Sequence, residues 1–171
     1  MTNSWIGQIS NLLATSRRTA FVGVGQELRG DDAAGVLAVR ALESAFASLP
    51  RGGGPEPAPF FFEAGPLPEA SAGPLRRFRP DGVVFLDAAD LGEPPGSVGW
   101  IEPDGIDDES AGTHAFPLQG FSRYLQNELG CRIALIGIQP RQMEFDSPAS
   151  LEVVSAIDEI VRQIVSAATH L

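Results

Sequence analysis

The stretch that most constrains the fold runs from Thr19 to Gly35 and reads TAFVGVGQELRGDDAAG. It begins as a short apolar run typical of a buried strand, and Gly23 and Gly25 then indicate a tight turn. Beyond Asp31 and Asp32, apolar residues recur at the spacing of one helix face: Val39, Leu42, Phe46 and Leu49. The stretch therefore predicts a strand, a glycine turn and a helix, with an acidic pair where the helix begins.

A strand and a helix joined by glycines first suggest a nucleotide site, but the details disagree. A dinucleotide fingerprint needs a third glycine at Leu28, and a P-loop has a lysine and a hydroxyl residue where this chain has Asp31 and Asp32. A helix N-terminus is equivalent to only about half a positive charge. The repulsion between two carboxylates and a polyphosphate is therefore stronger than the attraction from the helix. The turn therefore predicts a cation site, in which Asp31 caps the helix and Asp32 faces the ligand. The simpler alternative is an aspartate that only caps the helix.

Charge and composition narrow the class of protein and its partners. The 171 residues, 43% of them hydrophobic, predict one soluble globular domain over residues 1–171. A formal net charge of −10 argues against nucleic acid or an anionic membrane as a partner. No stretch of the sequence resembles a membrane span or a signal peptide, so we expect a cytoplasmic protein. The single Cys131 excludes an internal disulfide and fits a reducing compartment.

The remaining chain alternates apolar runs with segments of helical periodicity. The apolar runs predict strands at residues 60–63, 83–87, 97–103 and 132–138. The periodic segments predict helices at residues 3–16, 71–80, 114–129 and 148–164, the last with Pro148 in its first turn. This order predicts an α/β fold, a three-layer α/β/α sandwich around a mostly parallel sheet of about five strands, with residues 97–103 as an antiparallel edge strand. Residues 1–17 form an N-terminal helical extension of the domain.

Three residues near the predicted carboxyl edge of the sheet have the chemistry of a metal site. Asp32 follows the first strand, Asp87 ends the third, and His114 begins a helix after the next strand. Since the carboxyl ends of parallel strands meet at one edge, we expect the two aspartates to lie there and His114 to reach them. Two carboxylates and an imidazole suit a divalent metal such as Ni²⁺ or Zn²⁺. The simpler alternatives are that Asp87 bonds the backbone after its strand and that His114 is a structural residue of a helix start.

The signature segments of [NiFe]-hydrogenase maturation endopeptidases resemble three stretches of this chain: GVGQELRGDDAAG, LDAADLGEPPG and GTHAFPLQGFSRYLQNELGCRIALIGIQP. The three stretches occur in the family's order, and the resemblance is greatest to the branch that processes the hydrogenase 3 large subunit. The resemblance implies a cytoplasmic, monomeric protease, classed as an aspartic-type endopeptidase. It would remove the C-terminal extension of the large-subunit precursor after nickel insertion.

The resemblance also implies roles for individual residues. The family's metal-contacting positions fall on Asp32, Asp87 and His114, which are therefore expected to contact nickel carried by the precursor and to take part in catalysis. In the isolated protein another divalent metal is expected at the same site. The chain departs from the family at Gln26, where Asn is usual, and at Glu63, which begins a turn that replaces an Asp-Gly-Gly turn. A non-enzymatic nickel-binding chaperone of the large subunit, using the same three residues, is the alternative function.

Overall fold

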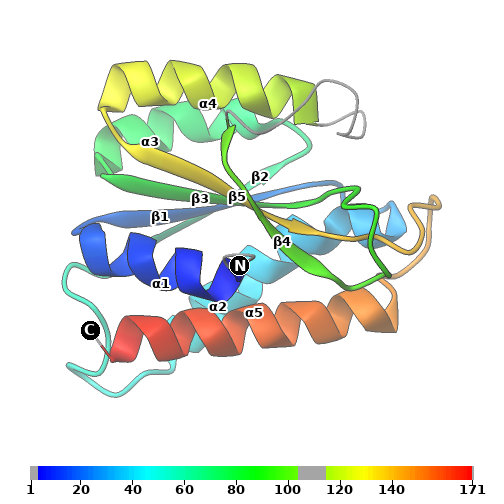
Figure 1. Cartoon of the computed structure of the whole chain (residues 1–171), viewed down its shortest axis with the longest axis horizontal. Helices are drawn as coiled ribbons and strands as arrows, with labels where there is room; N and C mark the ends of the chain where they lie inside the picture. Colours follow the sequence, from blue (N-terminus) through cyan, green and yellow to red (C-terminus); the bar gives the residue numbers. More distant parts are fainter. Residues whose placement is uncertain (1–3, 104–114, 171) are drawn as a thin grey trace.

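The computed structural model describes residues 4–103 and 115–170 of the chain. In this part of the chain, a single five-stranded sheet lies between two layers of helices (Figure 1). The strands in chain order are β1 (Thr19–Val24), β2 (Phe60–Gly65), β3 (Gly82–Ala88), β4 (Val98–Ile101) and β5 (Arg132–Ile138). Their order in the sheet is β2-β1-β3-β5-β4, and every neighbouring pair is parallel except β4 with β5. The predicted α/β/α sandwich with one antiparallel edge strand is therefore confirmed.

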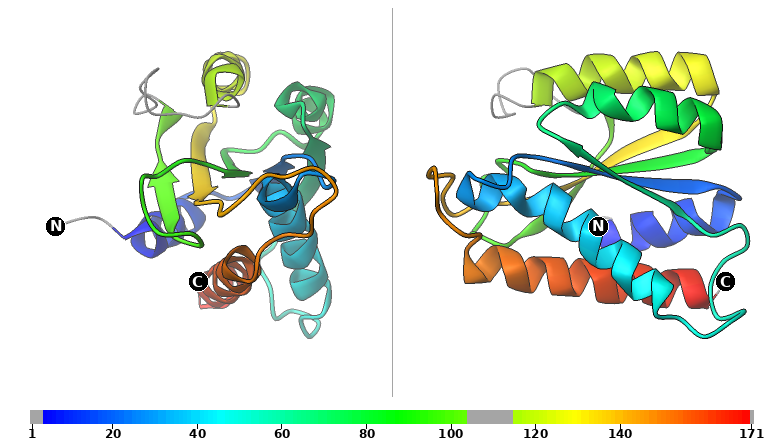
Figure 2. Two further views of the ribbon diagram at one scale, coloured as in Figure 1. Left: turned by 90° about the vertical axis from the view of Figure 1, so that its right-hand side faces the viewer. Right: turned by 180° about the vertical axis from the view of Figure 1, so that it is seen from behind.

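Helices cover both faces of the sheet (Figures 1 and 2). One face carries α1 (Trp5–Thr15), α2 (Ala34–Ala47) and α5 (Leu151–Thr169). The other face carries α3 (Ala72–Phe78) and α4 (Ala115–Leu129). Two short 3-10 helices, η1 (Gly30–Ala33) and η2 (Pro68–Ser71), lead into α2 and α3. None of the helices in the described residues is long and apolar enough to cross a membrane.

Burial on both faces explains why β1 and β3 are continuously apolar, because every residue of these two strands is buried. Successive residues of β3 enter different cores. Val84 and Leu86 pack in the core beneath α1, α2 and α5, whereas Val83 and Phe85 pack in the core beneath α3 and α4. The central strands therefore anchor both helical layers and fix where their carboxyl ends lie.

The main difference from the predicted elements is the start of α5. The helix begins at Leu151, after Ser150, whose hydroxyl accepts a hydrogen bond from the Val153 N–H at 3.4 Å. Pro148 lies in the preceding loop, where its carbonyl accepts a hydrogen bond from Gln142. In the first turn of α5, Val153 is buried and the Val154 side chain is 42% exposed. The predicted helix start at His114 lies outside the described residues.

Candidate functional site

Two glycines bring the start of α2 onto the ends of β1 and β3. A Cβ atom on Gly35 would lie 1.9 Å from the Leu86 carbonyl oxygen and 2.3 Å from that of Val24, so a larger residue cannot rest on both strands. Gly25 has a φ of +131°, and a Cβ atom there would lie 1.8 Å from the Asp32 carbonyl oxygen. The turn that carries Asp32 is therefore held directly against the end of β1.

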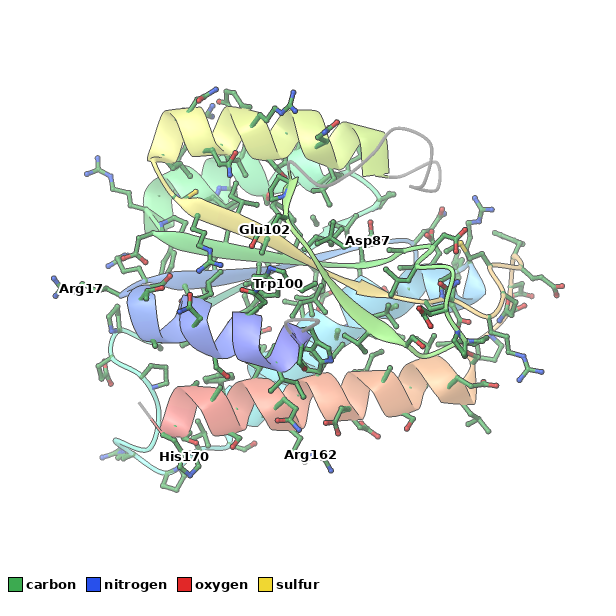
Figure 3. All side chains as sticks on the ribbon, viewed as in Figure 1. Arg17, Asp87, Trp100, Glu102, Arg162 and His170 are labelled. Carbon is green, nitrogen blue, oxygen red and sulfur yellow. The ribbon has the colours of Figure 1, made fainter. Side chains whose placement is uncertain are left out.

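Asp32 and Asp87 meet at this edge of the sheet. Asp87 is the last residue but one of β3, the neighbour of β1 in the sheet (Figure 3). Both side chains are almost fully buried, with 3% of Asp32 and 4% of Asp87 exposed. Burial, and after it the charge of Asp32, raises the pKa of Asp87 to about 8, although a hydrogen bond from the Ala88 backbone acts in the opposite direction. The structure thus brings two of the three predicted site residues together.

Two buried carboxyl groups that repel each other are unfavourable unless a proton or a cation lies between them. Because its pKa is about 8, Asp87 holds a proton at neutral pH when no cation is present. The donor set therefore fits a divalent cation in competition with that proton. Across residues 4–103 and 115–170, no three His, Cys, Asp or Glu side chains are grouped so that they could hold a metal ion. His114, the third predicted ligand, lies outside the described residues.

Asp31 does not cap α2, and that prediction is wrong. Neither η1 nor α2 has a side-chain cap among the described residues. The fully buried Asp31 carboxylate instead accepts hydrogen bonds from the backbone N–H groups of Arg141 (2.8 Å), Gln142 (3.2 Å) and Ser150 (2.6 Å). A fourth comes from the Ser150 hydroxyl at 2.9 Å. Asp31 therefore binds the loop between β5 and α5, a contact that the sequence pattern does not predict.

The signal that could have pointed to this loop is the LIGIQP sequence that ends the third signature segment. Its last residues, Gln139 and Pro140, directly precede the donors that Asp31 binds. Spacing along the chain gives no indication of such a contact, because the two segments are more than a hundred residues apart. Functional residues are nevertheless common in the loops that follow strands, so a motif at that place was a signal.

Glu63, at the carboxyl end of β2, takes part in a surface ion-pair cluster. Arg40 of α2 donates to both oxygens of Glu63, at 2.9 and 2.7 Å, and to Glu27 at 2.8 Å. The hydrogen bond from Arg40 also lowers the pKa of Glu27. All three side chains are more than a third exposed, so each pair contributes no more than about 1 kcal/mol. The cluster links the turn after β1 to β2 without adding a ligand to the acid pair.

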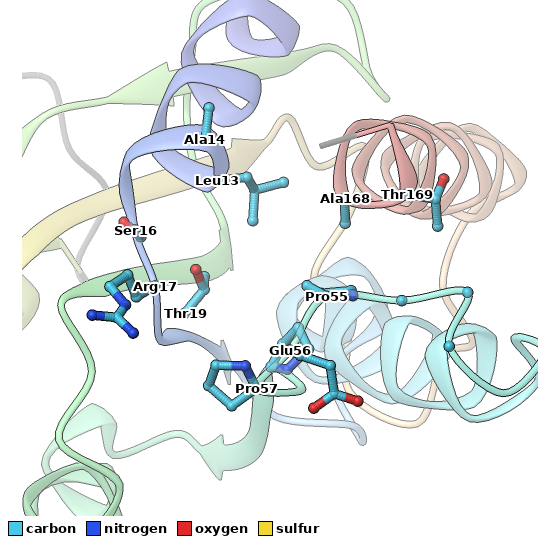
Figure 4. Close-up of a pocket in the computed structure, with 14 residues that line it drawn as sticks. Leu13, Ala14, Ser16, Arg17, Thr19, Pro55, Glu56, Pro57, Ala168 and Thr169 are labelled. Atoms are coloured by element: carbon cyan, nitrogen blue, oxygen red, sulfur yellow. The ribbon is translucent and has the colours of Figure 1, made fainter.

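A cavity of about 580 Å³ lies at the opposite end of the sheet (Figure 4). Its lining comes from the end of α1, the start of β1, the loop before β2 and the end of α5, and includes Arg17, Thr19 and Glu56. Neither Asp32 nor Asp87 lines it. The chemistry of the acid edge is therefore separate from this cavity.

Comparison with known proteins connects this chain and its fold to one group of enzymes. A sequence family described as hydrogenase maturation protease matches residues 48–167. A putative hydrogenase maturation protease of Methanocaldococcus jannaschii is 28% identical over 159 residues, which cover 90% of this chain and 89% of that protein. The hydrogenase 3 maturation protease of Escherichia coli is 29% identical over 142 residues, covering 82% of this chain and 85% of that protein.

Among solved structures, the crystal structure of the [NiFe] hydrogenase maturation protease HycI from Thermococcus kodakarensis matches with a TM-score of 0.82 and 27% identity. The match covers 94% of this chain and 98% of that one. The similarity therefore extends over almost the whole fold and is not confined to one motif.

Proposed function

Since this chain belongs to the hydrogenase maturation protease family, we propose that it is an endopeptidase that removes the C-terminal extension of a [NiFe]-hydrogenase large-subunit precursor after nickel insertion. The observation that carries the proposal is the buried pair of Asp32 and Asp87 at the carboxyl edge of the sheet. Open α/β sheets place their ligands at this edge. We further propose that the protein acts as a monomer on a protein partner, without nucleic acid or membrane.

Nickel enters this proposal as part of the substrate. We propose that the precursor's own ligands hold the ion and that Asp32, Asp87 and His114 complete its coordination. The support is electrostatic: burial, and after it the charge of Asp32, raises the pKa of Asp87, and a divalent cation between the two groups favours the ionised form. Metal binding requires the carboxylate form, so docking of the ion displaces the Asp87 proton. A precursor without nickel offers no such compensation, and the acid pair would thereby discriminate between the two.

Two routes to hydrolysis remain open in this proposal. In one, the acids act as an aspartic-type pair: Asp32 accepts the proton of a water as its oxygen bonds to the scissile carbonyl carbon. The protonated Asp87 then supplies a proton to the amine as the carbon–nitrogen bond breaks. In the other, both carboxylates and His114 only hold the substrate's nickel, and the ion supplies Lewis-acid chemistry to the water or the carbonyl. The raised pKa of Asp87 favours the first route whenever the ion does not contact Asp87.

Exposed apolar side chains near the acid edge support a polypeptide substrate. Leu28 is 57% exposed, Phe145 is 72% exposed and Leu151 is 84% exposed. Leu28 and Phe145 lie on neighbouring segments, because the Asp146 N–H donates to the Leu28 carbonyl at 2.8 Å. Large exposed apolar side chains are expected where another protein docks. A small-molecule substrate would not require them.

Intact-mass analysis of the large-subunit precursor tests the function. Incubation with this protein should lower the mass of the nickel-loaded precursor by that of the C-terminal extension and leave the nickel-free precursor unchanged. Asp32→Asn, Asp87→Asn and His114→Ala should prevent cleavage, whereas the control Asp158→Asn, an exposed position on α5, should not. Binding without any loss of mass would indicate the nickel-binding chaperone instead. Full cleavage by all three site variants would refute the assignment of the residues.

A further inference from the structure

The turn after β5, residues 139–142, contacts the element that carries Asp32. The Asp31 carboxylate accepts the backbone N–H groups of Arg141 and Gln142, and the Asp31 N–H donates in return to the Gln142 carbonyl at 2.9 Å. Asp31 directly precedes Asp32 in η1. The position of the first acid is therefore fixed relative to this turn.

The same turn contacts the segment that follows Asp87. The Gln139 side-chain oxygen accepts a hydrogen bond from the Leu91 N–H at 2.6 Å. The Ala89 N–H donates to the Ile138 carbonyl at 3.0 Å, just before the turn. Ala89 is the first residue after β3, the strand that holds Asp87. One short turn thus lies between the chain segments adjacent to both acids (Figure 1).

We propose that Asp31 and Gln139 are positioning residues, which set the separation between Asp32 and Asp87 through the turn at residues 139–142. The inference rests on the proposed function, in which that separation decides how the pair meets the substrate. When both groups are ionised, as metal binding requires, Asp32 and Asp87 repel each other, so other interactions must hold η1 and the end of β3 together. Hydrogen bonds from four donors to one buried carboxylate supply a strong and directional restraint.

A purely structural role explains the network less well. An apolar side chain at Asp31 would anchor the β5–α5 loop by burial, and buried polar groups are often replaceable in that way without loss of stability. Hydrogen bonds differ from apolar contacts because they fix direction and a narrow range of distance, about 2.7–3.2 Å for an N–H donor. Catalytic groups depend on such precision, since a displacement of about 1 Å can cost about a hundredfold in rate. The hydrogen-bond network is therefore suited to fixing the separation between Asp32 and Asp87.

Variants of Gln139 and Asp31 separate positioning from stability. Gln139→Met removes the acceptor for Leu91 but keeps the side-chain length, Gln139→Glu keeps an acceptor, and Asp31→Asn replaces one acceptor oxygen with a donor. Ile164→Val, in the α5 core away from the turn, is a control matched for lowered melting temperature. kcat and KM are measured on nickel-loaded precursor, well below every melting temperature.

Asp31→Asn and Gln139→Met should lower kcat about tenfold or more and change KM by less than about twofold. Gln139→Glu should recover most of the rate, and Ile164→Val should retain it. If Asp31→Asn fails to fold, the Gln139 pair decides the question alone. A folded Gln139→Met protein with the parent's kcat would overturn the proposal.

Amide hydrogen exchange gives a readout that does not depend on proteolysis. If the turn connects the two acid-bearing segments, Gln139→Met should accelerate exchange at the amide of Asp32, which donates to the Arg29 carbonyl, as well as at Leu91. If Gln139→Met exchanges faster at both sites but the parent protein cleaves no precursor, the link between the two acid-bearing segments stands and the proposed function is refuted. If Gln139→Met leaves exchange at Asp32 unchanged and the parent protein does cleave the precursor, the positioning role is refuted and the proposed function stands.

Discussion

Replacing Asp87 with Asn should remove the pH dependence that this buried carboxyl imposes on stability. The folded protein raises the pKa of Asp87 from 3.8 to about 8, chiefly through burial and then through the charge of Asp32. Between these two values the unfolded chain has lost the proton and the native protein still holds it. Stability therefore falls as pH rises through this window, and the loss is complete above pH 8. Below the unfolded pKa both states are protonated, and the contribution to stability is fully present.

The expected magnitude follows from the width of that window. Each unit of pKa shift corresponds to about 1.4 kcal/mol, so a shift of this size amounts to on the order of 5 kcal/mol between acidic and alkaline pH. Asn has nearly the same shape as Asp and does not ionise, so the Asp87→Asn variant lacks the loss. The assay is urea unfolding of both proteins from pH 5 to pH 9, because the difference between the two curves cancels the other titrating groups.

The parent should be several kcal/mol less stable than Asp87→Asn at pH 9, with the difference shrinking by about 1.4 kcal/mol per pH unit at most as the pH falls. Asp32→Asn should recover only the smaller part of the effect, because burial is the larger cause of the shift and the charge of Asp32 is the second. A stability difference that stays constant from pH 5 to pH 9 would refute the reasoning, since Asp87 would then titrate alike in both states.

Three further predictions test the packing around the site. Gly35→Ala should destabilise the protein by about 3 kcal/mol or more, because the added Cβ meets two carbonyl oxygens within 2.3 Å, whereas Gly7→Ala, with open space around it in α1, should stabilise by up to about 1 kcal/mol; thermal unfolding measures both, and equal effects would contradict the close approach. Arg40→Met should cost no more than about 2 kcal/mol, and the cost should vanish in 1 M salt because both ion pairs, to Glu27 and to Glu63, are exposed; a large cost that persists in high salt would contradict this. Phe145→Ser should raise KM for the precursor and leave the melting temperature unchanged, because the side chain is 72% exposed. Steady-state cleavage kinetics measure KM, and an unchanged KM would count against a substrate contact at Phe145.

Local sequence patterns were sufficient to predict most strands of the sheet. The run from Val83 to Leu86 is apolar because both faces of β3 are covered, and that burial is what the pattern reports. The antiparallel edge position of β4 was predicted as well. The start of α5 was misplaced because Pro148 and Ser150 are both acceptable near a helix start, and the choice depends on contacts with Gln142.

The acid pair itself was predictable, but what surrounds it was not. Strand alternation places Asp32 and Asp87 at one edge because crossover connections direct parallel strands the same way. Asp31 looked like a local cap, since sequence shows only the donors nearby in the chain. Its real partners lie in the β5–α5 loop, and only tertiary structure brings that loop beside η1. The sequence thus predicted that the two acids lie at one edge and gave no indication of what holds them there.

The arrangement around Asp32 and Asp87 opposes a repulsion that the two side chains themselves create. Burial raises the pKa of Asp87, and close backbone contacts at Gly25 and Gly35 leave the chain little room to separate the carboxyl groups. Two carboxylates held close together are stabilised strongly by one proton or one cation that neutralises part of their charge. Under the proposed function the substrate delivers the cation, so binding of the nickel-loaded precursor would replace the Asp87 proton with the ion. This exchange would make binding weaken as the pH falls, because protons then compete with the ion for Asp87.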